Sequence, residues 1–196
     1  MLKTSTISIK NFFENSYKKI SISKERENLL DTISNQIAKE YKEKGIVNLN
    51  FICTHNSRRS QFGQVWTFFA AKYFNLKINA FSGGTEVTAF FRNTVKTLQE
   101  EGFEFKLIDF SHRNPKYSIS FEGSKDAILG FSKLYDNKIN LNPFIAITTC
   151  DSADKNCPFI PTATHRFHLP FVDPKHADNT LKVLEVYEKT SMQIAG

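Results

Sequence analysis

The chain is poor in cysteine and has no long apolar run. It contains 3 cysteines in 196 residues, and an odd number argues against a secreted fold held together by disulfides. Three thiols in a protein of the cell interior suit redox or metal chemistry better. No apolar stretch is long enough to span a membrane, and the amino-terminal residues lack a signal-peptide pattern. We therefore expect a cytoplasmic protein that does not interact with a membrane.

Internal repeats and low-complexity tracts are also absent. With 40% hydrophobic and 23% charged residues, the chain is globular rather than disordered, and its length suits one domain with additions. The net charge of +6 raises the question of nucleic acid, but the lysines are spread along the chain rather than clustered. We expect a solvated basic surface that attracts small anions, and no nucleic-acid partner.

One polar segment joins two apolar ones in an order that indicates an anion site. Residues 53–60 read Cys-Thr-His-Asn-Ser-Arg-Arg-Ser, after an alternating apolar run at 47–52 and before apolar residues at helical spacing over 61–74. This pattern predicts a strand, a short loop and a helix. The geometry directs loop N–H groups and a helix N-terminus at one point, which is an anion-binding arrangement.

The residues of this loop have side chains suited to covalent chemistry on an oxyanion. The helix dipole and nearby guanidinium groups favour the thiolate of Cys53, so it can act as a nucleophile. Arg59 can hold two oxygens of a tetrahedral anion, and Ser60 can donate to the thiolate and cap the helix. Asn56 tolerates the left-handed backbone that such a loop requires. Thr54, His55, Ser57 and Arg58 complete the predicted oxyanion-binding loop. The alternative is an inert buried cysteine before a solvated basic loop.

The other two cysteines follow a second buried strand. The apolar run 144–149 is typical of a parallel strand and ends at Cys150, at the same sheet edge as Cys53. A thiol relay through Cys150 and Cys157 is therefore possible. The six residues between them fit a mobile segment whose thiols meet only after a rearrangement. The alternatives are two small core side chains, or a zinc site with His165 and His168, although their spacings match no common zinc pattern. We assign no metal and no cofactor.

Further segments have the periodicity of regular elements. A helix is predicted over 25–44, with one apolar face and a stop at Gly45. Strands are predicted over 77–82, 117–122 and 144–149, helices over 91–101, 127–135 and 180–194, and a turn at Gly83-Gly84. Strands that alternate with helices indicate a three-layer α/β fold with a short parallel sheet of about four strands. Ligands bind such sheets at the carboxyl ends of the strands, where Cys53 lies.

We divide the chain into an N-terminal helical extension, 1–45, and an α/β domain, 46–196, with an insertion over 111–143 before the last core strand. The helix of the extension is interpreted as docked on the domain, and a dimerisation helix is the alternative. Phe12 and Phe13 indicate a short packed segment ahead of it. The insertion is an extra hairpin and helix at the sheet edge, or alternatively a cover over the site.

The loop resembles a known family signature. Cys-x-x-Asn-x-x-Arg-Ser after a strand resembles the signature of low-molecular-weight protein tyrosine phosphatases and of the thioredoxin-coupled arsenate reductases that share their fold. The fuller match over 53–61, Cys-Thr-x-Asn-Ser-x-Arg-Ser-Gln, is more similar to the reductase branch, and 81–86 resembles the stretch after that family's second strand. His55 replaces a usual glycine, and Arg58 stands where that family often has a further cysteine.

The resemblance implies a mechanism. Residues 150–158 resemble the redox segment of these reductases, which implies that Cys53 attacks arsenate, Cys150 attacks the adduct and releases arsenite, and Cys157 forms a disulfide with Cys150. Thioredoxin would then restore the dithiol. Asp173-Pro174 resembles the family's general-acid motif, which implies that Asp173 protonates the leaving oxygen. Asp178 is the fallback candidate.

We therefore expect an arsenate reductase that takes a small oxyanion, with thioredoxin as its reductant. The alternative is a low-molecular-weight protein tyrosine phosphatase that hydrolyses phosphomonoesters through a Cys53 phospho-intermediate. Both need the same loop and the same acid, and Cys150 and Cys157 alone separate them. A hypothesis of another class is a catalytically silent oxyanion-binding or sensing protein, which the larger side chains of His55 and Arg58 motivate.

Overall fold

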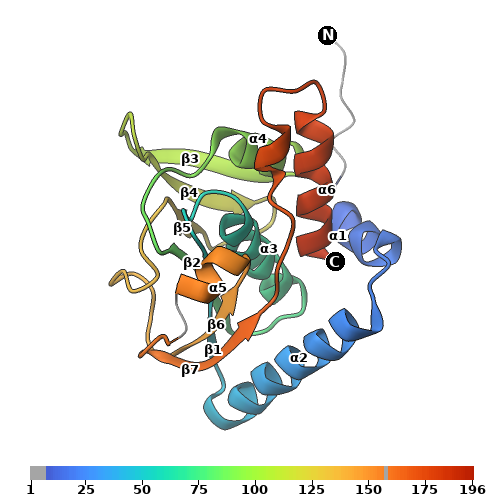
Figure 1. The fold of residues 1–196 in the computed structure, drawn as a ribbon, viewed down its shortest axis with the longest axis vertical. Coiled ribbons are helices and arrows are strands. Elements are labelled where there is room, and N and C mark those ends of the chain that lie inside the picture. Colours follow the sequence, from blue (N-terminus) through green and yellow to red (C-terminus); the bar gives the residue numbers. More distant parts are fainter. Residues whose placement is uncertain (1–7, 157–158) are drawn as a thin grey trace.

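A four-stranded parallel sheet forms the centre of the molecule. The computed structural model describes residues 8–156 and 159–196 (Figure 1). The strands are β1 (Val47–Cys53), β2 (Ile78–Gly84), β6 (Phe144–Thr148) and β7 (Ala163–His168). Their order is β2-β1-β6-β7, and every neighbouring pair is parallel. This confirms the predicted fold class. Strand β7 was not predicted. The insertion therefore precedes β6, the third strand of this sheet in the chain, and not the last core strand, which is β7.

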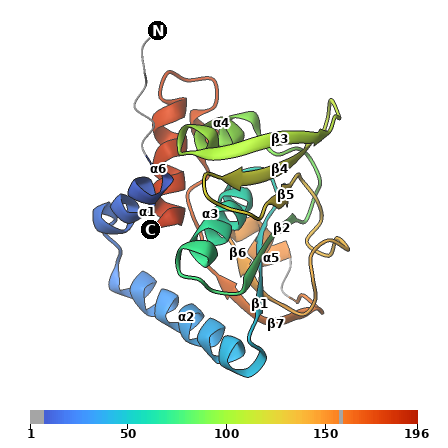
Figure 2. The same ribbon diagram turned by 180° about the vertical axis from the view of Figure 1, so that it is seen from behind.

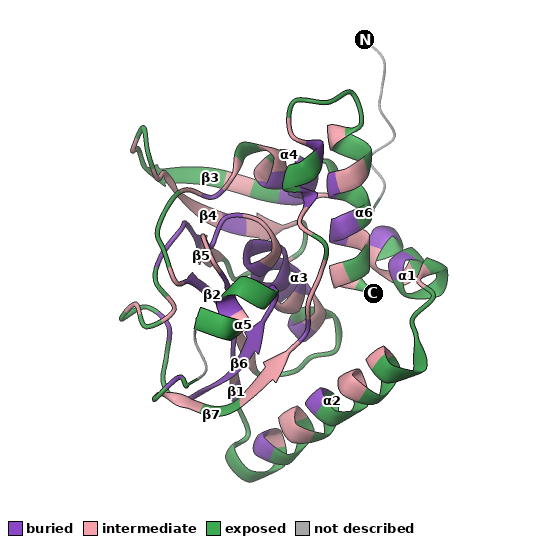
Figure 3. Ribbon diagram, viewed as in Figure 1, coloured by how far each residue is buried: buried purple, intermediate pink, exposed green. Residues whose placement is uncertain are grey.

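Helices cover both faces of this sheet because its side chains alternate between two apolar clusters. Helix α3 (Arg59–Tyr73) packs on β1 and β2, and α5 (Asp151–Asn156) packs on β1 and β6. Helices α4 (Arg92–Glu100) and α6 (Val183–Ala195) pack on α3 and on each other, and a short 3-10 helix, η1 (Pro174–Ala177), precedes α6. On β1, Leu49 and Phe51 join a cluster on one face, whereas Ile52 joins a cluster with Cys150 on the other. Figure 3 shows β6 buried along its length, as expected for an inner strand.

The insertion belongs to a second, smaller sheet. Strands β3 (Phe103–Asp109), β4 (Lys116–Phe121) and β5 (Ile128–Gly130) are antiparallel and lie beside α3 and α4 (Figure 2). The prediction of a strand over 117–122 is confirmed by β4. The predicted helix over 127–135 is wrong, because 128–130 pair with β4 and Leu134 bridges to Gly84. Long-range pairing has overridden the local helical pattern.

The predicted turn at Gly83-Gly84 is also wrong, since both glycines lie at the end of β2. They are needed for close approach rather than for turning. A Cβ on Gly83 would lie 2.2 Å from the Cα of Tyr135, and one on Gly84 would lie 2.7 Å from the carbonyl oxygen of Thr54. Strand β2 can therefore lie directly against the loop that follows β1.

The N-terminal extension is packed on the domain as two helices, α1 (Ile9–Lys19) and α2 (Lys24–Lys44). Phe12 is buried and stacks on Trp66, with ring centroids 5.3 Å apart, which confirms a packed segment there. The apolar face of α2 packs on the sheet, and Gly45 ends the helix with φ of +70°. The stated division into domains stays a prediction. None of the helices in the described ranges combines the length and apolar character needed to cross a membrane.

Candidate active site

In the loop after β1, the backbone carbonyl groups accept hydrogen bonds from donors outside the loop. The hydrogen bonds pair Thr54 O with Glu86 N (2.8 Å), His55 O with Ser132 Oγ (2.8 Å), Asn56 O with Gln61 Nε2 (3.0 Å) and Ser57 O with Phe91 N (3.1 Å). Within the part of the chain that the structure describes, no acceptor pairs with the N–H groups of 54–58. Asn56 has φ of 45°, which confirms its predicted left-handed conformation. Free amides continue into the first turn of α3, so the loop has the donor arrangement of an anion site.

A chain of three hydrogen bonds ends at the Cys53 sulfur. The Lys133 backbone N–H donates to Asn56 Oδ1 (2.9 Å), Asn56 Nδ2 donates to Ser60 Oγ (2.9 Å), and Ser60 Oγ lies 3.0 Å from Cys53 Sγ. Because Asn56 Oδ1 accepts from a backbone amide, its NH2 group must face Ser60. Ser60 then accepts from Asn56 and is left to donate its own hydrogen to the sulfur.

Two details of this chain were not predicted. The N-cap of α3 is Arg58, and no side chain caps the helix, so the predicted capping role of Ser60 is wrong. Lys133 was not identified at all, although it is 2% exposed and lies directly under the loop. Its Nζ is 3.4 Å from Ser82 Oγ, and burial lowers its pKa to about 7. A lysine within the insertion gives no local signal that it is buried.

Arg59 connects the loop to the segment that contains Asp173. Its NH2 group lies 2.5 Å from Asp173 Oδ2, and its NH1 group donates to the carbonyl oxygens of Phe171 (2.9 Å) and Thr149 (3.4 Å). The Arg59 Nε atom is buried and has no hydrogen-bond partner among the described residues. One guanidinium therefore holds the predicted acid on one side and retains a free donor in the buried interior.

Arg58 is directed away from the anion site. Its Nε donates to Tyr187 Oη (2.6 Å), its NH2 group donates to Asp178 Oδ2 (2.7 Å), and its Cζ lies 3.9 Å from the ring centroid of Phe91. Tyr187 also donates to Asp178. Burial, aided by the hydrogen bond to Asp178, raises the pKa of Tyr187 well above its usual value. Asp178, the fallback candidate for the acid, therefore forms an ion pair with Arg58. The side chain of Arg58 faces this ion pair, and its backbone N–H is the group that faces the loop.

Cys150 lies against the same loop. Its Sγ is 3.6 Å from Thr54 Oγ1, and both Cys150 and Cys53 are buried in one apolar cluster. This confirms that the two cysteines share one edge of the sheet. The N–H of Ala153 also donates to Cys150 Sγ (3.4 Å), at the start of α5. The predicted mobile segment over 151–156 is helical in the structure, and Cys157 lies outside the described residues.

The two histidines of the alternative zinc site have other partners. His165 Nδ1 lies 3.4 Å from Glu40 Oε1, and His168 Nδ1 lies 3.0 Å from Thr148 Oγ1. In the described ranges, no three His, Cys, Asp or Glu side chains are grouped closely enough to hold a metal ion. His55, the histidine of the loop after β1, faces Glu86, with 3.4 Å between its Nε2 atom and Glu86 Oε2.

Comparison with known proteins identifies the family. No family model matches the chain. A low-molecular-weight protein tyrosine phosphatase from T. tengcongensis has a TM-score of 0.51 at 17% identity, over 76% of this chain and 93% of that one, which shows the fold. The arsenate reductase of Bacillus licheniformis is 32% identical over 130 residues, 66% of this chain and 76% of that protein. That of Staphylococcus aureus (strain Newman) is 32% identical over 124 residues, 63% of this chain and 76% of the relative.

The fold and the loop after β1 thus define an enzyme with the low-molecular-weight phosphatase fold. Within that class, the chain belongs to the arsenate reductase family.

Proposed function

We propose that the protein reduces arsenate to arsenite, with Cys53 as the nucleophile and Cys150 and Cys157 as a disulfide relay. The observation that carries the proposal is the contact between Cys150 Sγ and Thr54 Oγ1, 3.6 Å apart, which puts a second thiol at the loop that contains Cys53. A phosphatase of this fold needs the loop and the acid alone, so a second buried thiol at the loop favours reduction.

The loop binds the oxyanion through its free amides and through the unpaired Nε of Arg59. The same guanidinium holds Asp173 through NH2, so the acid lies across one planar group from the bound anion. Ser60 donates to the Cys53 sulfur and supports its thiolate form. Cys53 then attacks arsenic, and the oxygen that leaves takes a proton from Asp173 and departs as water.

The reduction follows by thiol exchange. The Cys150 thiolate attacks Cys53 Sγ, the sulfur–arsenic bond breaks, and its electron pair stays on arsenic, which leaves as arsenite. The Cys157 thiolate then attacks Cys150, which frees Cys53 and forms a Cys150–Cys157 disulfide. Two thiols thus supply the two electrons that arsenate accepts. We propose that a dithiol protein of the thioredoxin type reduces this disulfide and completes the cycle.

The test compares Cys53→Ser, Cys150→Ser and Cys157→Ser in two assays: thioredoxin-linked arsenate reduction and hydrolysis of an aryl phosphate. Cys53→Ser is expected to abolish both activities. Cys150→Ser and Cys157→Ser are expected to abolish arsenate turnover and to leave hydrolysis intact. Ser152→Ala, an exposed change in α5, is the matched control and is expected to change neither.

The assays also separate the competing functions. Arsenate reduction that persists in Cys150→Ser would contradict the relay. Hydrolysis without any arsenate reduction in the parent protein would favour a phosphatase with a Cys53 phospho-intermediate. Tight oxyanion binding with neither activity would favour a sensing protein.

A further inference from the structure

The segment that contains Asp173 is held to the core by backbone hydrogen bonds and by the side chains of Leu169 and Phe171, which pack in one apolar cluster. After β7, Leu169 N donates to Thr148 O (2.9 Å) and Phe171 N donates to Thr149 O (3.2 Å). The Phe171 carbonyl oxygen accepts from Arg59 NH1 (2.9 Å), two residues before Asp173. Phe171 is therefore fixed through both of its backbone polar groups, and its position decides where Asp173 meets Arg59.

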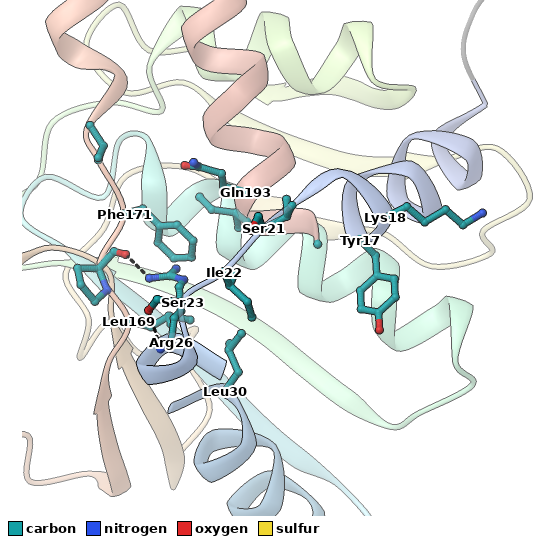
Figure 4. A pocket seen from close by; sticks show the side chains of 15 residues that line it. Tyr17, Lys18, Ser21, Ile22, Ser23, Arg26, Leu30, Leu169, Phe171 and Gln193 are labelled. Carbon is teal, nitrogen blue, oxygen red and sulfur yellow. Dashed lines mark hydrogen bonds between the residues drawn. The ribbon is translucent and has the colours of Figure 1, made fainter. Parts of the chain in front are cut away.

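A side chain of the N-terminal extension contacts the same segment. Arg26 NH1 donates to the carbonyl oxygen of Pro170 (2.8 Å), and Arg26 Cζ lies 4.5 Å from the ring centroid of Phe171. Figure 4 shows the guanidinium of Arg26 against this ring, with its hydrogen bond dashed. The extension, remote in sequence from the site, therefore holds the two residues that precede Val172 and Asp173.

The position of Arg26 is unfavourable for an arginine without a specific role. Ser23 caps α2 by accepting from Arg26 N, so Arg26 lies in the first turn, where the helix dipole disfavours a cation. Burial lowers the pKa of its guanidinium, and no carboxylate of the described residues forms an ion pair with it. Its contacts are a carbonyl oxygen and an aromatic face, the two groups that a planar guanidinium binds at once.

A pocket of about 640 Å³ borders the segment and is lined by Arg26 and by residues 169–172, among others (Figure 4). Its apolar lining includes Ile22, Leu30 and Ile194, and Val172 at its rim is 69% exposed. Without the Arg26 contacts, the segment would border open space on this side and could move into it.

We propose that Arg26 is a positioning residue, which holds Pro170 and Phe171 so that Asp173 stays within reach of Arg59 and of the leaving oxygen. The role of Asp173 as the acid rests on the proposed function. The N-terminal extension then helps to orient the active site through the contacts that Arg26 makes with Pro170 and Phe171.

The first test uses Arg26→Ala and Arg26→Lys, with Lys24→Ala as a control in the same turn of α2. A misplaced acid slows departure of a basic leaving group more than that of an acidic one. We expect Arg26→Ala to lower kcat for phenyl phosphate roughly tenfold, a part of the roughly 100- to 10,000-fold that general acids contribute. The rate for p-nitrophenyl phosphate and KM for both should change less than about twofold. Arg26→Lys should restore little, because an ammonium group cannot stack and donate in the same way.

The second test needs no activity. Hydrogen–deuterium exchange of 169–173 should be faster in Arg26→Ala than in the parent and in Lys24→Ala, while exchange of β1 and α3 stays unchanged. Unchanged exchange in 169–173 would overturn the proposal, as would faster exchange with an unaltered ratio of the two hydrolysis rates. If the parent protein neither reduces arsenate nor hydrolyses an ester, the proposed function is in error. In that case, or if the protein reduces arsenate but hydrolyses no ester, the exchange measurement by itself decides whether Arg26 positions the segment.

Discussion

Thr54 Oγ1 and Cys150 Sγ lie 3.6 Å apart and join the loop after β1 to the start of α5. The hydroxyl is at hydrogen-bonding distance for a sulfur atom, and the two residues are separated by 96 positions in sequence. Since Thr54 follows Cys53 directly, this contact places Cys150 against the loop that contains Cys53.

Thr54→Val removes the hydroxyl and keeps the shape of the side chain. We expect arsenite release to slow by roughly fivefold, the effect of losing one hydrogen bond of about 1 kcal/mol, because Cys150 loses its orienting partner. Aryl phosphate hydrolysis, which does not use Cys150, should be unaffected. Rapid-quench single turnovers with arsenate and steady-state hydrolysis measure the two effects. Equal losses in both would show that the substitution disturbs the loop instead.

Asp173→Asn keeps an oxygen that can accept from Arg59 but removes the acidic proton. The first chemical step should slow by about 100-fold or more, whereas inhibition constants for oxyanions should change little, since the loop amides are untouched. The comparison variant is Asp178→Asn, because the carboxylate of Asp178 in the parent protein pairs with Arg58 rather than with Arg59. Rates that stay the same in Asp173→Asn would remove this residue as the acid.

Arg58→Met tests whether this side chain serves the fold or the anion. Its partners Asp178 and Tyr187 would lose a partly buried cation, so we expect the free energy of unfolding to fall by about 1–3 kcal/mol. Oxyanion inhibition constants should be nearly unchanged, because the Arg58 backbone N–H remains. Urea denaturation and inhibition assays decide, with the exposed Arg113→Met as a control. A large loss of oxyanion affinity would show instead that the Arg58 side chain contributes to anion binding.

Lys133→Met tests the cost of the buried cation under the loop. The unfolded chain keeps its proton to the ordinary pKa of 10.5, whereas the folded protein releases it near a pKa of about 7. Between these values the unfolded state binds more protons, so stability rises with pH, and below the folded pKa the full cost applies. The variant should therefore gain most over the parent at about pH 6 and least towards about pH 10, and the gain should shrink by up to about 1.4 kcal/mol for each pH unit between the two pKa values. Urea unfolding of both proteins across this range measures the difference, and a difference independent of pH would contradict it.

The sequence carried most of the site and part of the fold. The loop, its flanking strand and helix, and the shared edge of Cys53 and Cys150 all follow from local periodicity and from the rules of parallel sheets. Strand β7 was missed because its sequence, Ala-Thr-His-Arg-Phe-His, has little apolar alternation. In the structure these polar side chains find specific partners, such as Thr164 with Glu40 and Arg166 with Asp154.

The residues that support the site were not predictable in the same way. Lys133 meets Asn56 across 77 positions, and Arg26 meets Pro170 across 144. Such contacts depend on how the insertion and the extension fold back, and no local pattern encodes them. The predicted helix over 127–135 failed for the same reason, because pairing with β4 decides the conformation there.

The absence of a side chain at Gly84 has a consequence for selectivity. Even one methyl group there would collide with backbone atoms of Thr54, Asn56 and Glu86, at 2.6 to 2.8 Å. Strand β2 therefore packs directly against the loop backbone, and the loop cannot move towards the strand. The width of the anion site is thus fixed by the folded sheet. A rigid anion site selects its ligands by size and shape, and we expect it to bind tetrahedral anions more tightly than planar or larger ones.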